Sequence, residues 1–289
     1  MVDRISIKTM TEAFVICLIV FLMSSCGIDQ ESVISPYPTG PNPSPNAEGW
    51  LPPTVGLTWQ WQLDSTEPDL SPSAMVFDLD YETDPVLIAE LKQKGVYTIC
   101  YISVGSWEDW RPDADRFPKE LLGKRYRGWQ GERWLDIRRM DLLAPLLQNR
   151  MDQCVLSGFD ALEPDNMDIS SNNSGFPITY EDQLAFAQWL AQESHARGLA
   201  IGQKNAPEMT DDLVDLFDFA ITEDCFTEGW CSDFLPYPQK GKAVFAAEYT
   251  DSDIDFTFAC QWGEEMSFSF ILKNRDLDGW MQSCPNTRR

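Results

Sequence analysis

Acidic side chains follow several short apolar runs of this sequence. The run FDAL precedes Glu163 and Asp165, the run FAIT precedes Glu223, and the run VFAA precedes Glu248. A similar run, MVFDLD, contains Asp78. Unpaired acids cost free energy when they are buried behind apolar segments. We therefore expect these carboxyl groups to meet in one site and to serve its chemistry.

Several acids beside a single histidine favour glycoside hydrolysis. That reaction needs one protonated carboxyl group for the leaving oxygen and one ionised carboxylate as nucleophile or base. Crowded acids supply this difference, because mutual repulsion raises one pKa above the other. The histidine, His195, lies in the polar sequence SHARG, where we expect a solvated surface residue and not a catalytic base. No CxxC pair occurs, so we expect neither a metal nor a cofactor.

Other polar and aromatic residues stand at the ends of similar runs. Lys204 and Asn205 end one run, and Lys273 ends another. Aromatic faces at such positions can stack on sugar rings, although core packing explains many of them; these residues are Trp59, Trp61, Tyr101, Trp107, Trp110 and Tyr249. We predict that substrate is bound by Trp61, Asp78, Tyr101, Glu163, Asn166, Lys204, Glu248 and Tyr249. A structural role is an equally good alternative for Asp78, Asp224 and Lys273, in which each forms hydrogen bonds or ion pairs at a strand end.

The elements that must position these residues form a repeated pattern. Eight apolar or β-branched runs predict strands over residues 59–63, 75–80, 97–105, 159–166, 199–205, 219–226, 243–249 and 267–274. Helical stripes lie between them over residues 85–94, 141–157, 180–197 and 209–217. Eight strand-then-helix units predict an α/β fold, a single-domain (β/α)8 (TIM) barrel, in which the carboxyl ends of the strands carry the site. No GxGxxG turn follows the first strand, which argues against a dinucleotide-binding fold.

The segment 106–137 interrupts this pattern after the third predicted strand. It is rich in Trp, Arg and Asp, and its residues 134–137 (WLDI) form a candidate extra strand. Long loops at the strand ends of barrels often shape the pocket. We expect this insertion to do so.

The N-terminal part has the composition of an export signal and a tether. Arg4 and Lys8 precede an apolar run over residues 14–23, which is too short for a permanent membrane span. Small residues then precede Cys26, as in bacterial lipoproteins. We predict a signal peptide over residues 1–25, lipidation of Cys26, a Pro- and Ser-rich linker over 26–53 and the barrel over 54–289. The alternative is ordinary secretion with Cys26 incidental.

Charge and cysteine content limit the possible partners. The formal net charge of −24 repels nucleic acid and anionic lipid headgroups, so we expect a cationic or neutral polymer as partner, membrane contact only through the lipid anchor, and a monomer. Outside Cys17 and Cys26, six of the eight cysteines remain, an even number that favours disulfides in an exported protein. Cys225 and Cys231 are close enough to close a small loop. Pairings of Cys260 with Cys284 and of Cys100 with Cys154 are two of many possible connectivities.

A series of segments resembles one family of glycoside hydrolases. WQWQL, CYISVG, WLDI, GFDALEPDN, TEDCF, GKAVFAAEYTD and FILKNRDLD resemble, in this order, the endo-α-1,4-polygalactosaminidases, whose fold is a (β/α)8 barrel. The resemblance spans about residues 50–284 and implies that Asp165 and Glu223 are the catalytic pair. It also implies a bond between Cys225 and Cys231. Met167 and the stretch 226–230 depart from the common form of the family.

The resemblance implies an enzyme that cleaves α-1,4-linked, galactosamine-containing polysaccharide internally. We assign Asp165 as nucleophile and Glu223 as general acid and base, and their separation decides between retention and inversion of the anomeric centre. Such a polymer is cationic when deacetylated and would be attracted by an acidic groove. One alternative is a lipid-anchored protein that binds or scaffolds the glycan without cutting it. Another is hydrolysis of a different amino-sugar polymer, or of a uronic polymer, which the negative charge would repel.

Overall fold

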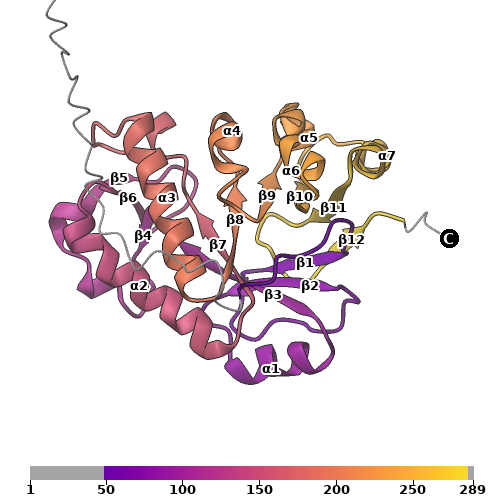
Figure 1. Cartoon of the computed structure of the whole chain (residues 1–289), viewed down its shortest axis with the longest axis horizontal. Helices are drawn as coiled ribbons and strands as arrows, with labels where there is room; N and C mark the ends of the chain where they lie inside the picture. The colour runs from indigo at the N-terminus through magenta and orange to yellow at the C-terminus, as the bar shows by residue number, and fades with distance from the viewer. Residues whose placement is uncertain (1–48, 286–289) are drawn as a thin grey trace, which may run out of the picture. The chain divides into compact units, whose positions relative to one another are not determined.

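The described part of the chain, residues 49–285 of a computed structural model, forms a (β/α)8 barrel (Figure 1). Its strands are β1 (Trp59–Gln62), β2 (Val76–Asp80), β3 (Tyr97–Ser103), β7 (Ala161–Asp165), β8 (Ala200–Lys204), β9 (Phe219–Glu223), β10 (Val244–Tyr249) and β11 (Phe268–Lys273). Neighbouring strands pair in parallel and in chain order. All eight predicted strands are present, and the predicted fold class is confirmed.

The helices differ from the prediction of one helix after every strand. They are α1 (Pro85–Gln93), α2 (Met140–Ser157), α3 (Tyr180–Ala196), α4 (Thr210–Leu213), α5 (Cys225–Glu228), α6 (Pro236–Gln239) and α7 (Phe256–Met266). No helix lies between β1 and β2, and β11 leads to an antiparallel strand, β12 (Met281–Ser283). The helix predicted over 209–217 is shorter, because a 3-10 turn (Pro207–Met209) precedes α4. The other 3-10 turns are Ala114–Arg116, Lys119–Leu121, Ile169–Ser171 and Cys231–Phe234.

The insertion forms a small antiparallel sheet of its own. Its strands are β4 (Ser106–Glu108), β5 (Leu122–Arg125) and β6 (Glu132–Leu135), with β6 in the centre. The extra strand predicted over 134–137 therefore exists, although it begins and ends earlier. The sheet lies beside α2 and the upper end of α3 in Figure 1.

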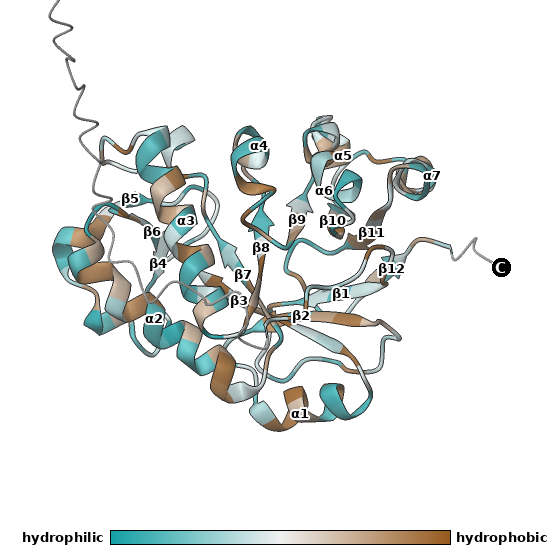
Figure 2. Cartoon of the chain, viewed as in Figure 1, coloured by the Kyte–Doolittle hydropathy of each residue, from teal (hydrophilic) through white to brown (hydrophobic). Residues whose placement is uncertain are grey.

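Each barrel strand has two buried faces, which explains its near-continuous apolar sequence. Alternate residues such as Val76, Ala161 and Phe219 pack inside the barrel, whereas Phe77, Leu79 and Leu162 pack against the surrounding layer. Helices α2 and α3 show alternating hydrophobic and hydrophilic bands (Figure 2), and they bury residues such as Leu143, Leu147, Phe186 and Leu190 in the core. By the period of two along a strand, Asp78, Glu163, Asp165 and Glu223 point into the barrel.

The barrel closes between β1 and β11 through side chains. Trp59 Nε1 donates to the carbonyl oxygen of Ser269 at 2.9 Å, and Lys273 Nζ donates to Gln60 Oε1 at 3.0 Å. Among the described residues no backbone ladder joins these two strands. Lys273 thus has the alternative, structural role considered for it.

Three disulfides link the described residues. Cys225 pairs with Cys231, Cys260 with Cys284, and Cys100 with Cys154. The last bond ties β3 to α2, and the second ties α7 to the segment after β12. The predicted signal peptide, Cys26 and most of the linker lie outside the described residues. No described helix is long and apolar enough to span a membrane.

Candidate active site

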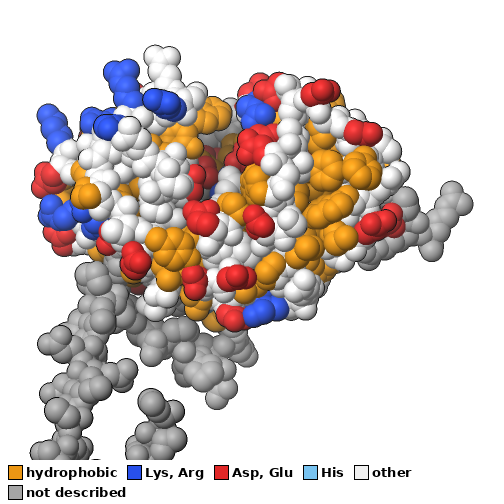
Figure 3. Space-filling model, turned by 90° about the horizontal axis from the view of Figure 1, so that it is seen from above, with side chains coloured by type: hydrophobic (Ala, Val, Ile, Leu, Met, Phe, Trp, Pro, Cys, Tyr) orange, Lys and Arg blue, Asp and Glu red, His pale blue; other side chains and the backbone are white. Residues whose placement is uncertain are grey.

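A cavity of about 550 Å³ opens at the carboxyl ends of the barrel strands. Figure 3, which views the molecule of Figure 1 from above, shows acidic side chains around a central hollow. Nine carboxyl groups line the cavity, against one lysine and one arginine. The predicted site residues in its wall are Trp61, Tyr101, Asp165, Asn166, Lys204 and Glu223.

The predicted catalytic pair, Asp165 and Glu223, meets at one ammonium group. Lys204 Nζ lies 3.1 Å from Asp165 Oδ1 and 3.2 Å from Glu223 Oε2. Its other carboxylate partner is Glu163 Oε1, at 2.9 Å. The two catalytic candidates come from β7 and β9, with the β8 lysine between them. The geometry therefore brings both carboxylates to the same wall of one pocket.

Further donors orient each carboxylate. Tyr101 Oη donates to Asp165 Oδ2 at 2.9 Å, and Tyr249 Oη donates to Glu223 Oε1. Asn205 Nδ2 donates to Glu223 Oε2 at 3.3 Å. The side chains of Asp165 and Glu223 keep 19% and 28% of their surface exposed. Both are thus held in place and open to the cavity.

Lys204 stays charged although it is fully buried. Burial alone lowers the pKa of an ammonium, but Asp165, Glu163 and Glu223 together outweigh burial and hold the pKa of Lys204 well above its usual range. Its Nζ also lies 4.5 Å from the ring centre of Trp61. The lysine therefore supplies a permanent positive charge beneath the pair.

Asp78 and Glu163 lie one layer deeper than the pocket wall. Both are fully buried, and ionised forms of the two would leave both oxygens of Asp78 and Oε2 of Glu163 without a donor. Burial, followed by repulsion from Glu163, raises the pKa of Asp78 well above its usual range. A protonated Asp78 can donate one hydrogen bond to Glu163, which gives each of the two carboxyl groups a partner. These two predicted substrate-binding residues support Lys204 from below and do not line the cavity.

Glu248 points away from the pocket. Its neighbours Val244 and Ala246 on β10 pack outside the barrel, so the period of two turns Glu248 outward as well. Its carboxylate accepts from the backbone nitrogens of Phe226 at 2.7 Å and Thr227 at 3.1 Å. This placement corrects the prediction of a substrate contact: Glu248 instead holds the turn after β9.

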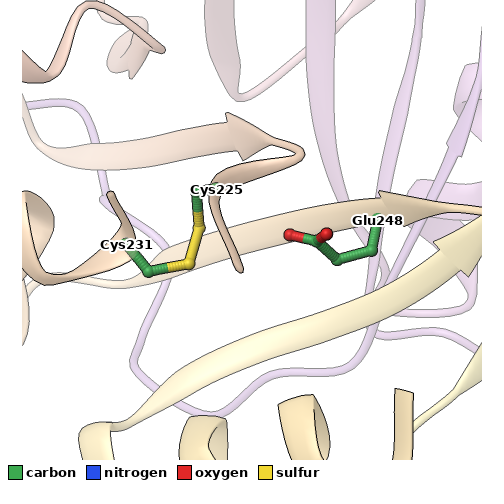
Figure 4. A group of neighbouring side chains, drawn as sticks. All are labelled: Cys225, Cys231 and Glu248. Atoms are coloured by element: carbon green, nitrogen blue, oxygen red, sulfur yellow. A yellow bond between two sulfur atoms is a disulfide. The ribbon is translucent and has the colours of Figure 1, made fainter. Parts of the chain in front are cut away.

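Glu248 also lies beside the disulfide of Cys225 and Cys231 (Figure 4). These three side chains are close enough to surround a cation. Because both sulfurs are bonded to each other, neither offers a thiolate ligand. We assign the group to the fold and not to a metal.

Tyr249 and the remaining aromatics take different positions. Tyr249 is buried inside the barrel and reaches the site only through its hydroxyl group on Glu223. Trp59 packs at the seam of the barrel, and Trp107 donates to the carbonyl oxygen of Ala114 at 3.0 Å. His195 is not the solvated residue that we predicted, because Nε2 contacts Asp218 Oδ2 at 2.8 Å and its ring stacks on Trp50.

The turns after β7, β8 and β9 adopt left-handed backbone conformations. Asn166, Asn205, Ala206 and Asp224 have φ between 46° and 62°. Such conformations cost free energy for residues other than glycine, although asparagine and aspartate tolerate them best. They cluster directly after the strand ends that carry Asp165, Lys204 and Glu223.

The insertion forms one wall of the pocket and is fixed by buried arginines. Arg111 makes a two-pronged contact with Glu108 at 2.8 Å and contacts Asp80 on β2 at 2.7 Å. Arg150 on α2 binds Asp113 at 2.8 Å and the carbonyl oxygen of Ser103 at 3.0 Å. This network joins the insertion to the barrel, so the insertion is a fixed wall.

Several pocket residues were not among the predicted site residues. They include the acids Asp64, Glu82, Glu108, Glu132, Asp168 and Asp276, together with Tyr126 and Trp129. Trp110 and Trp129 line the cavity, and 50% and 52% of their surface is exposed. The composition of the insertion was the available signal, because it supplies Glu108, Trp110, Tyr126, Trp129 and Glu132.

A barrel with two carboxylates at its strand ends, on one wall of an acidic cavity, defines a class of glycoside hydrolases. Within that class, the chain belongs to glycoside-hydrolase family GH114, whose model matches residues 40–289. This membership confirms the resemblance seen in the sequence. A comparison with curated proteins gave no match.

Solved structures show the same relationship. The chain is 32% identical to Ega3 of Aspergillus fumigatus, solved in complex with galactosamine, with a TM-score of 0.77 over 83% of this chain and all of that chain. The glycoside hydrolase domain of PelA from Pseudomonas aeruginosa shares the fold at 16% identity and a TM-score of 0.66, over 79% of this chain and 99% of that domain. An α-galactosidase of Thermus thermophilus shares it at 10% identity and a TM-score of 0.53, over 77% and 59%.

Proposed function

We propose that this protein hydrolyses internal α-1,4 bonds of a galactosamine-containing polysaccharide, with Asp165 and Glu223 as the catalytic pair. One observation carries the proposal: two partly exposed carboxylates share Lys204 at the wall of an acidic cavity. Family membership and the 32% identity to a protein crystallised with galactosamine support the substrate class.

The electrostatics of the cavity favour a cationic polymer. Nine carboxyl groups face two basic side chains there, and the whole chain carries −24. A low-dielectric cleft lined by one sign of charge concentrates ligands of the opposite sign. Trp110 and Trp129 offer exposed faces for sugar rings at the same cavity. A deacetylated galactosamine chain satisfies both requirements.

The roles within the pair follow from exposure and partners. Asp165 is the less exposed carboxylate and is held by Lys204 and Tyr101, which suits a nucleophile. Glu223 lies nearer to solvent, where a leaving group and a water molecule can reach it. The nearest oxygens of the pair are no farther apart than the sum of their two distances to Lys204 Nζ. This closeness favours the shorter carboxyl separation of about 5–5.5 Å that retaining enzymes use, so we propose retention.

We also propose that the enzyme is exported. The three disulfides among the described residues fit an oxidising compartment. The predicted signal peptide (residues 1–25), a lipid on Cys26 and the linker (26–53) would hold a catalytic domain (54–289) at the bacterial envelope. Secretion without the lipid is the alternative. Metabolic labelling with a tagged fatty acid, compared between the natural chain and Cys26→Ala, distinguishes the two.

Chain-length analysis of a partly deacetylated α-1,4-galactosamine polymer tests the proposed activity. The protein is expected to release short oligomers and to create new reducing ends, while Glu265→Gln, a change of an exposed acid on α7, should behave like the natural chain. Unchanged polymer length would refute the activity. Tight binding without any shortening would instead support the scaffolding alternative.

A further inference from the structure

Glu132 on β6 is a carboxyl group of the pocket that the catalytic proposal does not use. It belongs to the insertion, is 8% exposed, and lines the cavity together with Asp165. Its Oε2 accepts from Ser106 Oγ at 2.7 Å. Within the described part of the chain, its Oε1 accepts no hydrogen bond. A buried acid with one oxygen satisfied and the other free in a cavity is prepared to receive a donor from a ligand.

A directed chain of donors fixes Glu132 relative to the catalytic strand. Asn166, the residue after Asp165, donates through Nδ2 to Ser103 Oγ at 3.0 Å and to Ser106 Oγ at 3.2 Å. Ser106 Oγ in turn donates a hydrogen bond to Glu132 Oε2. Because an amide NH2 can only donate, the chain runs one way and ends at a carboxylate acceptor.

The backbone at this point leaves little freedom. A Cβ on Gly105 would lie 1.8 Å from the carbonyl oxygen of Asn166, so only glycine permits this close approach of the β3 and β7 ends. Asn166 itself has φ of 62°. The fold therefore fixes the position of Glu132 beside β7, the strand that carries Asp165. This also explains why Asn166, predicted to bind substrate, uses its amide internally.

We propose that Glu132 selects a deacetylated sugar at the binding position beside Asp165, its free oxygen accepting a hydrogen bond from the ammonium group of a galactosamine unit. An N-acetylated unit offers a single amide donor and no charge. Its acetyl group is also larger than an ammonium group and needs additional space at this position. The buried carboxylate would then lose its charged partner. This inference rests on the proposed function and adds the recognition of the 2-amino group to it.

The surroundings of Glu132 make this selection depend on pH. Burial, followed by repulsion from Glu108 and Asp165, raises the pKa of Glu132 to about 7, against the opposing effects of Ser106 and Arg111. The other titratable groups near it are Tyr101 and Tyr126, both neutral at this pH because burial raises the pKa of each. Below pH 7 the unliganded enzyme therefore carries a neutral Glu132, which attracts an ammonium group less strongly.

The test reads the sugars that flank each cleaved bond. The full chain digests a half-acetylated α-1,4-galactosamine polymer at pH 5 and pH 7, and mass spectrometry identifies the sugar at each new chain end. With the natural chain at pH 7, the ratio of galactosamine to N-acetylgalactosamine at one of the two new ends should be at least about fivefold higher than in the polymer. This enrichment should fall at pH 5. With Glu132→Gln it should disappear at both pH values while cleavage continues.

Two further variants sharpen the outcome. Ser106→Ala keeps the carboxylate but removes its donor, so enrichment should fall between the two extremes, whereas Glu265→Gln, with the same chemical change on the exposed face of α7, should match the natural chain. Unchanged enrichment in Glu132→Gln would overturn the inference. So would loss of all cleavage by that variant, through misfolding or otherwise, since Glu132 would then serve the fold or the chemistry. No new chain ends with the natural chain would instead refute the proposed function.

Discussion

At the scale of single residues, the site is organised around Lys204. Its ammonium contacts Glu163, Asp165 and Glu223, and beneath it a protonated Asp78 completes the set. Burying these charges costs desolvation free energy, and the attraction between the acids and the lysine offsets that cost only when all of them are present. Lys204 thus offsets the mutual repulsion of the two proposed catalytic carboxylates, Asp165 and Glu223, and fixes their positions.

Replacing Lys204 by methionine should damage both stability and turnover. The change leaves buried carboxylates without their cation, so we expect the free energy of unfolding to fall by about 3–5 kcal/mol, measured by urea denaturation. Turnover of the polymer should fall at least about 100-fold. Lys240→Met removes an exposed ion pair with Asp215 and should cost at most about 1 kcal/mol. Equal effects of the two variants would contradict the role of Lys204.

The stereochemistry of the first product tests the proximity of Asp165 and Glu223. Because one ammonium contacts both carboxylates, the two lie close together, as in retaining enzymes, and hydrolysis should retain the anomeric configuration. Proton NMR in the first minutes of digestion should show α-reducing ends before they mutarotate. Initial β-ends would show inversion and a wider active separation of the two carboxylates.

Residue type and strand position predicted part of this site. Asp165, Glu223 and Lys204, which end strands, and Tyr101, which lies near the end of β3, were placed correctly in the cavity wall, because the carboxyl ends of the strands must converge. Glu248 was not, because both faces of a barrel strand are apolar and the sequence VFAAEY shows no alternation from which to choose its face.

At the scale of elements, the strands were more predictable than the connections between them. The eight apolar runs locate the eight strands because each is buried on both faces. The absence of helices after β1 and β11 has no comparable signal in the sequence. Side chains such as Trp59 and Lys273 join these two strands and close the barrel. The pocket wall formed by the insertion depends on contacts between residues that are distant in sequence, Arg111 with Asp80 and Arg150 with Asp113.

The seam between β1 and β11 gives the stability a pH dependence. Burial lowers the pKa of Lys273 to about 8, against opposing attraction from Asp278, Asp64 and Asp276. Between pH 8 and 9.5 the unfolded chain, with an ordinary lysine pKa of about 10.4, binds more protons than the folded protein at this residue. Its contribution to stability therefore rises with pH in that window. The urea midpoint of the natural chain should therefore rise relative to that of Lys273→Met between pH 8 and 9.5. A constant difference over this range would contradict the effect of Lys273.

At the scale of the whole molecule, net charge and pocket charge have the same sign. The chain carries −24, and nine carboxyl groups line the cavity. The sequence alone predicted the sign of this field. It could not predict that so many acids come to one cavity, because several of them, such as Asp64 and Asp276, lie on loops far apart in the chain.

Salt should therefore slow cleavage of the charged polymer selectively. Raising the ionic strength from about 0.01 to 0.15 M shortens the screening length from about 30 to 8 Å, so kcat/KM for a deacetylated polymer should fall at least about tenfold. A fully acetylated polymer, which is neutral, should show less than about a twofold change. Initial rates at low substrate concentration measure both. Equal salt dependence of the two polymers would show that long-range attraction does not contribute to cleavage.

The most direct test of the catalytic pair compares new reducing ends formed from one polymer by the natural chain, Asp165→Asn and Glu223→Gln. Both variants keep the size of the side chain but replace one acceptor oxygen by an NH2 donor, so thermal unfolding first verifies that each variant is folded. Turnover should fall at least about 1,000-fold in each, because neither residue has a substitute at the required position. Near-natural turnover in either folded variant would contradict the assignment of the two carboxylates.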